Sequence, residues 1–158
     1  MNQATLINQQ LLVNLLAEAA SSPRQRKNKN FHASDDAACH RLLNALQPET
    51  YVQPHCHFSA DKEETMVVLI GKMGLILFND DGSVAMTQVA SAGGDCVGIN
   101  IPPRMFHSLV ALEPVVFFEA KAGPYVPVAL EERAAWAPSE GDAACAQYRE
   151  WMRSLFVA

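Results

Sequence analysis

The sequence predicts an all-β dominated domain, an antiparallel barrel or sandwich with a helix at each end. Three observations support this fold class. Short apolar or alternating runs follow one another from about residue 51 to residue 119, no helical pattern interrupts them, and turn-forming Gly, Pro, Asn and Asp residues separate them. The runs are TMVVLIG, MGLILFND, SVAMTQVA, CVGINIPP, HSLVAL and VVFFEAKA. Many short strands at regular spacing are typical of antiparallel β domains.

The turn and end segments refine this prediction. The NDDG turn at residues 79–82 predicts a hairpin. Leucines at i, i+3 and i+4 spacing from Leu6 to Leu16 predict a helix with Thr5 as its N-cap, ended by residues 21–23. Residues 31–46 allow either a short helix or an extended lead-in. Near the C-terminus, WAPSEGD predicts an ordered loop and Asp142 the cap of a last helix.

Length and composition indicate one domain. The chain has 158 residues, of which 49% are hydrophobic and 18% charged, so it can bury a core. We expect a helical and basic extension (1–48) packed on the barrel, a barrel core (49–122), and a C-terminal loop and helix (123–158). There is no apolar run long enough for a membrane span and no basic leader with a cleavage site, so we expect a cytoplasmic protein.

The formal net charge of -5 argues against general binding to nucleic acid or to an anionic membrane surface. PRQRKNKN is a local exception, with Arg24, Arg26, Lys27 and Lys29 close together. This segment is either a solvated basic turn or an anion-binding rim at which Arg24 and Arg26 contact substrate.

Three histidines and one carboxylate form a candidate metal site. His55 and His57 are two residues apart, so on a strand they share one face and Cys56 points to the other. Glu64 opens the next strand on a face that is otherwise apolar, where a carboxylate is costly unless a cation neutralises it. His107 opens a later strand after two prolines. Three nitrogens and one oxygen suit Zn, Fe(II), Mn(II) or Ni(II) better than Ca or Mg.

These residues resemble the two motifs of the cupin family. PHCHFSADKEETMVVLIG is similar to HxH followed by Glu, six residues and Gly, and GINIPPRMFHSLVA is similar to PxGxxH. Arg104 stands where the second motif has Gly. Over nearly its whole length the chain resembles the WbuC-type cupin fold metalloproteins, whose barrel is an RmlC-like jelly roll. The resemblance implies a single double-stranded β-helix with one divalent metal bound by His55, His57, Glu64 and His107.

Four other residues are candidates for catalysis. Arg104 is either a solvated turn residue, with φ above zero if the turn is tight, or a guanidinium at the barrel mouth that clamps a substrate anion. Glu119 is either an inward second acid or one half of an exterior salt bridge with Lys121 or Arg41. Tyr51 and Tyr125 are each either core residues or substrate contacts.

The sequence leaves the reaction open among three functions. A metal-dependent enzyme, isomerase- or epimerase-like, would use Lewis-acid chemistry on a small polar, anionic or sugar-derived substrate. The alternatives are a non-catalytic ligand-binding or regulatory cupin and an Fe(II)-dependent dioxygenase. The resemblance also implies a link to polysaccharide biosynthesis and a homodimer.

Overall fold

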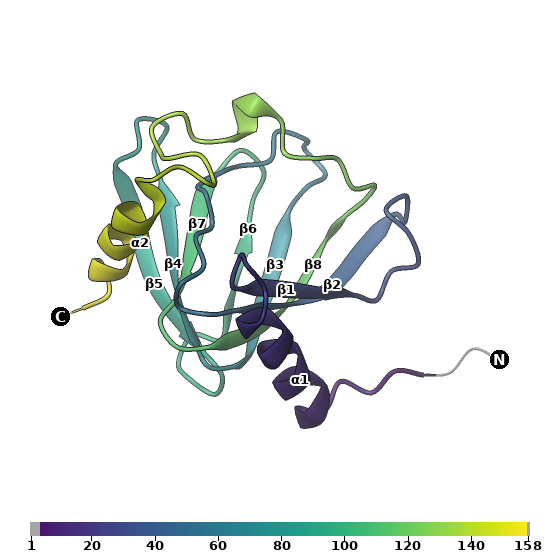
Figure 1. The fold of residues 1–158 in the computed structure, drawn as a ribbon. Helices are drawn as coiled ribbons and strands as arrows, with labels where there is room; N and C mark the ends of the chain where they lie inside the picture. Colours follow the sequence, from purple (N-terminus) through teal and green to yellow (C-terminus); the bar gives the residue numbers. More distant parts are fainter. Residues whose placement is uncertain (1–3, 158) are drawn as a thin grey trace.

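A computed structural model describes residues 4–157 of the chain. Within this part, eight strands form two antiparallel sheets, with a helix near each end (Figure 1). The elements are α1 (Gln9–Ala20), β1 (Arg26–Asn30), β2 (Cys39–Leu46), β3 (Glu64–Ile70), β4 (Lys72–Phe78), β5 (Val84–Ser91), β6 (Gly98–Ile101), β7 (Phe106–Ala111), β8 (Val115–Ala122), the 3-10 helix η1 (Leu130–Glu132) and α2 (Cys145–Ser154). This is the predicted cupin jelly roll.

The larger sheet has the order β1-β2-β8-β3-β6 and the smaller one the order β5-β4-β7. The six predicted runs form β3 to β8, and the NDDG turn joins β4 to β5 as a hairpin. In that turn the Asn79 N–H donates to Ser83 O at 2.9 Å, and Gly82 takes a φ of +86°. Glycine adopts a positive φ without steric cost, so the Gly in NDDG was the sequence signal that predicted this hairpin turn.

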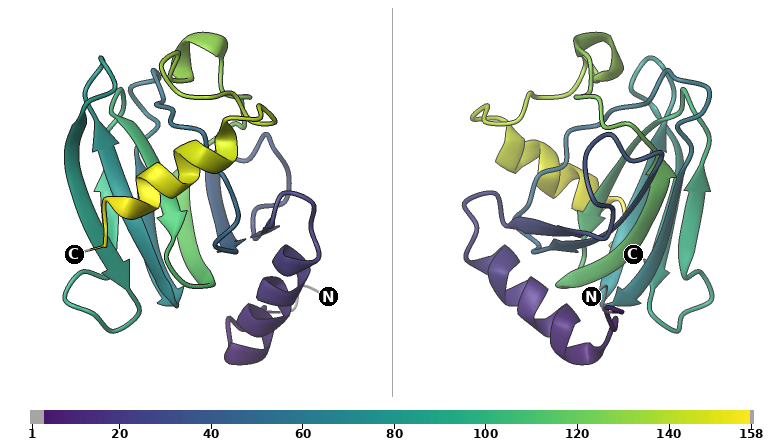
Figure 2. Two further views of the ribbon diagram at one scale, coloured as in Figure 1. Left: turned by 60° about the vertical axis from the view of Figure 1, so that its left-hand side comes forward. Right: turned by 90° about the vertical axis from the view of Figure 1, so that its right-hand side faces the viewer.

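The two sheets face each other across an interior core, and a helix packs on part of the outer face of each (Figure 2). Side chains from both sheets form the interior core, among them Met66, Met73, Leu75, Leu109 and Phe117. Leu12, Leu15 and Ala19 of α1 pack against the outer face of β2 and β8. Met152 of α2 packs against Ile76 and Val110 on the outer face of the smaller sheet.

The N-terminal helix begins later than predicted, and Thr5 is not its cap. The Asn8 side chain accepts a hydrogen bond from the Leu11 N–H at 3.0 Å, and Asn8 has the extended backbone of an N-cap. Leu6 and Ile7 are exposed ahead of the helix. The predicted end is confirmed, because Ser21 is the C-cap.

The strand β1 was not predicted, and β2 was one of two alternatives. In the basic segment, residues 23–25 form a turn and bend, and Arg26–Asn30 form the edge strand β1. Residues 39–46 form β2, so the extended alternative for that region is the right one. At the other end, α2 begins after Ala144, and Asp142 does not cap it. The Asp142 carboxylate instead accepts the Ser139 N–H at 2.8 Å.

Within residues 4–157, no helix combines the length and the apolar character that crossing a bilayer requires.

Candidate metal centre

The segment that carries His55 and His57 connects β2 to β3 and is held against β7. The His55 N–H donates to His107 O at 3.1 Å, and the His107 N–H donates to His55 O at 2.9 Å. Glu64 is the first residue of β3, and His107 is the second residue of β7. Backbone pairing therefore brings His107 to the segment of His55 and His57, and Glu64 at the start of β3 meets His107 there.

The three predicted imidazole ligands lie around the Glu64 carboxylate. His57 Nε2 lies 3.1 Å from Glu64 Oε1, and His107 Nε2 lies 3.0 Å from Glu64 Oε2. The donor atoms of His55, His57 and Glu64 all lie within 4.8 Å of one another. His107 is outside that mutual set; its ring centroid is 6.2 Å from that of His57 and 4.6 Å from that of His55.

Backbone carbonyls orient two of the imidazoles. His55 Nδ1 lies 2.9 Å from Gln53 O, and His107 Nδ1 lies 2.9 Å from Met105 O. A carbonyl only accepts, so both Nδ1 atoms donate and each Nε2 keeps its lone pair for a metal ion. Burial, followed by the neighbouring His107, lowers the pKa of His55 to about 3, so His55 is neutral at physiological pH.

The donor atoms fit a metal ion. Among the described residues, Glu64 Oε2 and His107 Nε2 are buried side-chain atoms without a hydrogen-bond partner. Buried polar groups are nearly always partnered, and a cation near these two atoms would satisfy both. Three imidazoles and a carboxylate are suitable ligands for a divalent transition metal.

Lys121 lies beside this cluster, and the sequence did not single it out as a site residue. Its Nζ lies 3.0 Å from Glu64 Oε1 and 2.7 Å from Glu119 Oε1. Burial opposes the charge of Lys121, but the carboxylates of Glu119 and Glu64 outweigh it and raise the pKa of Lys121. Burial likewise opposes ionisation of Glu64, but the hydrogen bond with His57 and the charge of Lys121 lower its pKa. Glu64 is therefore ionised and Lys121 is charged.

Glu119 points inward, in agreement with the first of its two predicted roles, an inward second acid. It is buried, and the Asn44 side chain donates to its Oε2 at 2.6 Å. Its ion-pair partner is Lys121, one of the two partners named in the second predicted role, but the pair faces the interior and not the barrel exterior. Both line a cavity of about 210 Å³ together with His55, Glu64 and His107. The cluster thus opens onto a cavity that carries a second carboxylate and an ammonium group.

The structure does not bring Arg104 or Tyr51 into this cavity. Arg104 takes a φ of +65°, the tight-turn geometry that its position predicted, and its guanidinium lies over the Phe58 ring, 5.4 Å from the centroid. Tyr51 is buried under α2 and donates its hydroxyl to Pro138 O at 2.7 Å. Cys56 is buried outside the ligand group, as expected, and burial raises its pKa to about 11.

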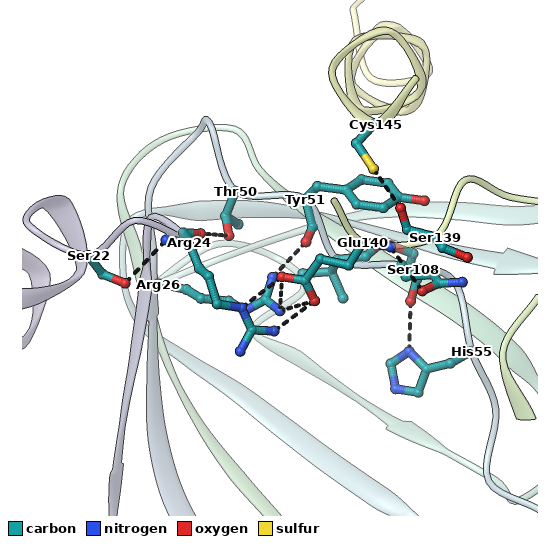
Figure 3. A network of polar contacts seen from close by, with 12 residues as sticks. Ser22, Arg24, Arg26, Thr50, Tyr51, His55, Ser108, Ser139, Glu140 and Cys145 are labelled. Atoms are coloured by element: carbon teal, nitrogen blue, oxygen red, sulfur yellow. Dashed lines mark hydrogen bonds and ion pairs between the residues drawn. The ribbon is translucent and has the colours of Figure 1, made fainter. Parts of the chain in front are cut away.

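Arg24, Arg26 and Tyr125 lie around a neighbouring cavity of about 310 Å³. Arg24 and Arg26 both contact the Glu140 carboxylate, as Figure 3 shows. Tyr125 is 54% exposed, so core packing does not describe it.

Comparison with solved structures shows the fold. A conserved Streptococcus pyogenes protein of unknown function matches with a TM-score of 0.53 and 11% identity, over 80% of this chain and 93% of its own. The capsular polysaccharide assembling protein CapF from Staphylococcus aureus matches with 0.53 and 18%, over 63% of this chain and 27% of its own. KdgF from a Halomonas species matches with 0.50 and 19%, over 66% and 84%. These likenesses identify the cupin jelly roll.

No curated protein matches the sequence. Residues 7–90 match a family described as a domain of unknown function, DUF6016. That stretch runs from α1 to β5 and includes His55, His57 and Glu64. The chain has the cupin jelly-roll fold, and by its sequence it belongs to the DUF6016 family.

Proposed function

We propose that the chain is a cupin metalloenzyme that binds one divalent transition metal through His55, His57, Glu64 and His107. The observation that carries the proposal is the contact between Glu64 Oε2 and His107 Nε2, two buried acceptor atoms that face each other at 3.0 Å because His107 Nδ1 donates to Met105 O. Without a cation this pair would be costly. The metal is Zn, Fe, Mn or Ni, since those ions accept imidazole and carboxylate together.

The proposed reaction is an isomerisation or epimerisation of a small polar or sugar-derived substrate. A metal ion at this position supplies Lewis-acid polarisation of a carbonyl or enediol oxygen. Glu119 can accept a proton from a substrate carbon in the cavity. Its Oε1 is buried, and among the described residues its only polar contact is the ion pair with Lys121. Lys121 remains protonated and stabilises negative charge that develops beside it.

The sugar-derived substrate is part of the proposal. The sequence resembles WbuC-type cupins, and one structural neighbour is a capsular polysaccharide assembling protein. Both favour a role in polysaccharide biosynthesis, by association only. The homodimer also remains a prediction, which light scattering of the purified chain tests.

Metal content tests the site. Protein purified without added metal should contain about one equivalent of a transition metal by elemental analysis. The double variant His57→Ala with Glu64→Gln should lose it, whereas Glu63→Gln should keep it. Glu63 is the matched control because it is the exposed residue directly before Glu64. Equal metal content in all three proteins would refute the ligand assignment.

Proton exchange tests the reaction. NMR in D2O should show metal-dependent exchange at a carbon next to a carbonyl, across nucleotide sugars and small oxo-acids. Glu119→Gln should slow the exchange at least about 100-fold with unchanged metal content. A metal-loaded protein that binds a ligand without exchange would favour the non-catalytic reading, and iron content with oxygen consumption would favour a dioxygenase.

A further inference from the structure

Two arginines at the mouth of the barrel hold one carboxylate from the C-terminal loop. Arg24 Nε and Nη2 each lie 2.7 Å from an oxygen of Glu140. Arg26 Nη2 lies 2.9 Å and 2.8 Å from the same two oxygens. Arg26 begins β1 and Arg24 lies in the turn before it, whereas Glu140 lies in the C-terminal loop. Figure 3 shows both guanidinium groups pointing at Glu140. This is the geometry in which arginine binds a carboxylate or a phosphate.

The contact lies next to the candidate metal centre. The 310 Å³ cavity that contains Arg24 and Glu140 shares Arg26, Val52 and His55 with the 210 Å³ cavity of the metal ligands. His55 thus faces both. A small molecule bound at the metal ligands can therefore extend past His55 towards Arg24 and Arg26.

This cavity is positively charged, whereas the chain as a whole is acidic. Its lining includes three arginines, at positions 24, 26 and 133, and Glu140 as the one carboxylate. The whole chain carries a formal charge of -5. A cationic cavity in an acidic protein favours an anionic ligand.

The two arginines differ in how firmly they are held. The Arg26 side chain is 21% exposed, and its Nη1 also donates to Tyr51 O at 2.6 Å, so Arg26 keeps its place without Glu140. The side chains of Arg24 and Glu140 are 60% and 39% exposed. Solvent reaches both of these side chains, so an incoming anion can compete with Glu140 for the arginines.

The loop has other attachments that do not depend on Glu140. Pro138 O accepts the Tyr51 hydroxyl, and the Ser139 N–H donates to Asp142 at 2.8 Å. Trp136 packs against Phe78 with ring centroids 4.8 Å apart. The Glu140 carboxylate can leave the arginines while the loop remains on the barrel.

We propose that Arg24 and Arg26 bind the carboxylate or phosphate group of the substrate, and that Glu140 fills this subsite as a displaceable internal anion. The inference rests on the proposed function in that it names the substrate class of the same site. It adds that the substrate is anionic at the end remote from the metal ligands.

Anion binding to metal-free protein tests this subsite separately from the metal. Titration calorimetry of chelator-treated protein would use inorganic phosphate and acetate as probes. Glu140→Gln should bind the preferred anion about 3- to 10-fold more tightly than the wild type, because the internal competitor is gone. Tighter phosphate binding would assign a phosphate group, and tighter acetate binding a carboxylate.

Three variants complete the test. Arg24→Gln and Arg26→Gln should each weaken anion binding at least about fivefold. Arg26→Gln also loses the hydrogen bond to Tyr51 O. If that loss unfolds the protein, the anion affinity of Arg24→Gln decides the test. Glu150→Gln makes the same charge change on α2, where Glu150 pairs with its neighbour Arg149, and should bind as the wild type does.

An unchanged affinity in Glu140→Gln, or no measurable anion binding by any of these proteins, would overturn the inference. In either case the ion pair only fastens the loop. The metal content of the same preparations, measured before chelation, reports on the metal centre independently. A protein that binds metal but no anion contradicts the subsite alone, and one that binds the anion but no metal contradicts the proposed metal centre alone.

Discussion

The backbone of Arg104 holds His57 in position. The Arg104 N–H donates to His57 O at 2.7 Å, and this turn requires a φ of +65° at Arg104. The guanidinium meanwhile lies over Phe58 in a cation–π contact. Arg104 therefore acts on the candidate metal centre through its main chain, and its side chain lies outside the cavity of the metal ligands.

Substitutions at Arg104 should separate main chain from side chain. Arg104→Gly should keep the metal and change the free energy of unfolding by less than about 1 kcal/mol, since relief of the positive φ offsets the lost cation–π contact. Arg104→Val should destabilise by about 1 kcal/mol or more, because a β-branched residue tolerates this φ poorly. Urea unfolding measures both. Loss of substrate binding in Arg104→Gly but not in Arg104→Lys would instead support a cationic clamp.

The β strands of the core were predictable because their apolar side chains alternate or form short continuous runs. β1 and β2 were not. β1 reads RKNKN, whose inward residues are polar because they line cavities at the open side of the barrel. β2 is covered on both faces from Leu42 to Leu46, since α1 covers Leu43 and Ala45, so this part of its pattern has no period of two.

The residues of the candidate site also divide into those that the sequence indicated and those that it did not. Spacing and motif resemblance together singled out His55, His57, Glu64 and His107, because two residues on one strand share a face and the two cupin motifs indicated the others. Lys121 and Asn44 were not identified, because their role depends on which strands are neighbours. β8 lies between β2 and β3, and this order places Lys121 opposite Glu64. Strand order is not encoded in local periodicity.

Lys121 should be the most important single cation for the stability of the metal-free protein. Lys121→Met leaves Glu64 and Glu119 buried without their shared counter-ion and should destabilise the protein by about 3 kcal/mol in urea unfolding. The matched control is Lys72→Met, whose pair with Glu113 is exposed and should contribute less than about 1 kcal/mol. Adding Glu119→Gln to Lys121→Met should restore part of the loss. Equal effects at Lys72 and Lys121 would contradict this account.

Acid should destabilise the metal-free protein in two stages. The pKa of His55 falls from 6.5 to about 3 on folding, so below pH 6.5 the unfolded chain binds a proton that folded His55 does not. The pKa of Glu64 is also lowered from 4.5, so a second loss begins as the pH falls towards 4.5. Both contributions are present at neutral pH.

Urea unfolding at a series of pH values measures these contributions. His55→Gln should flatten the dependence between about pH 6.5 and 4.5, and Glu64→Gln should flatten it below that range. If His55→Gln has the same pH dependence as the wild type, His55 is not held neutral by folding.

Two glycines with nearly the same φ should respond very differently to alanine. Gly71, which ends the first cupin motif, has a φ of +76°, and an added Cβ would lie 2.0 Å from Pro114 O. Gly93 has a φ of +72° with nothing within 4 Å of that position. Gly93→Ala should cost only the strain of a positive φ, about 1 kcal/mol, whereas Gly71→Ala adds a backbone clash and should cost about 3 kcal/mol or more. Equal losses in thermal unfolding would show that the β3–β4 turn can move away from Pro114.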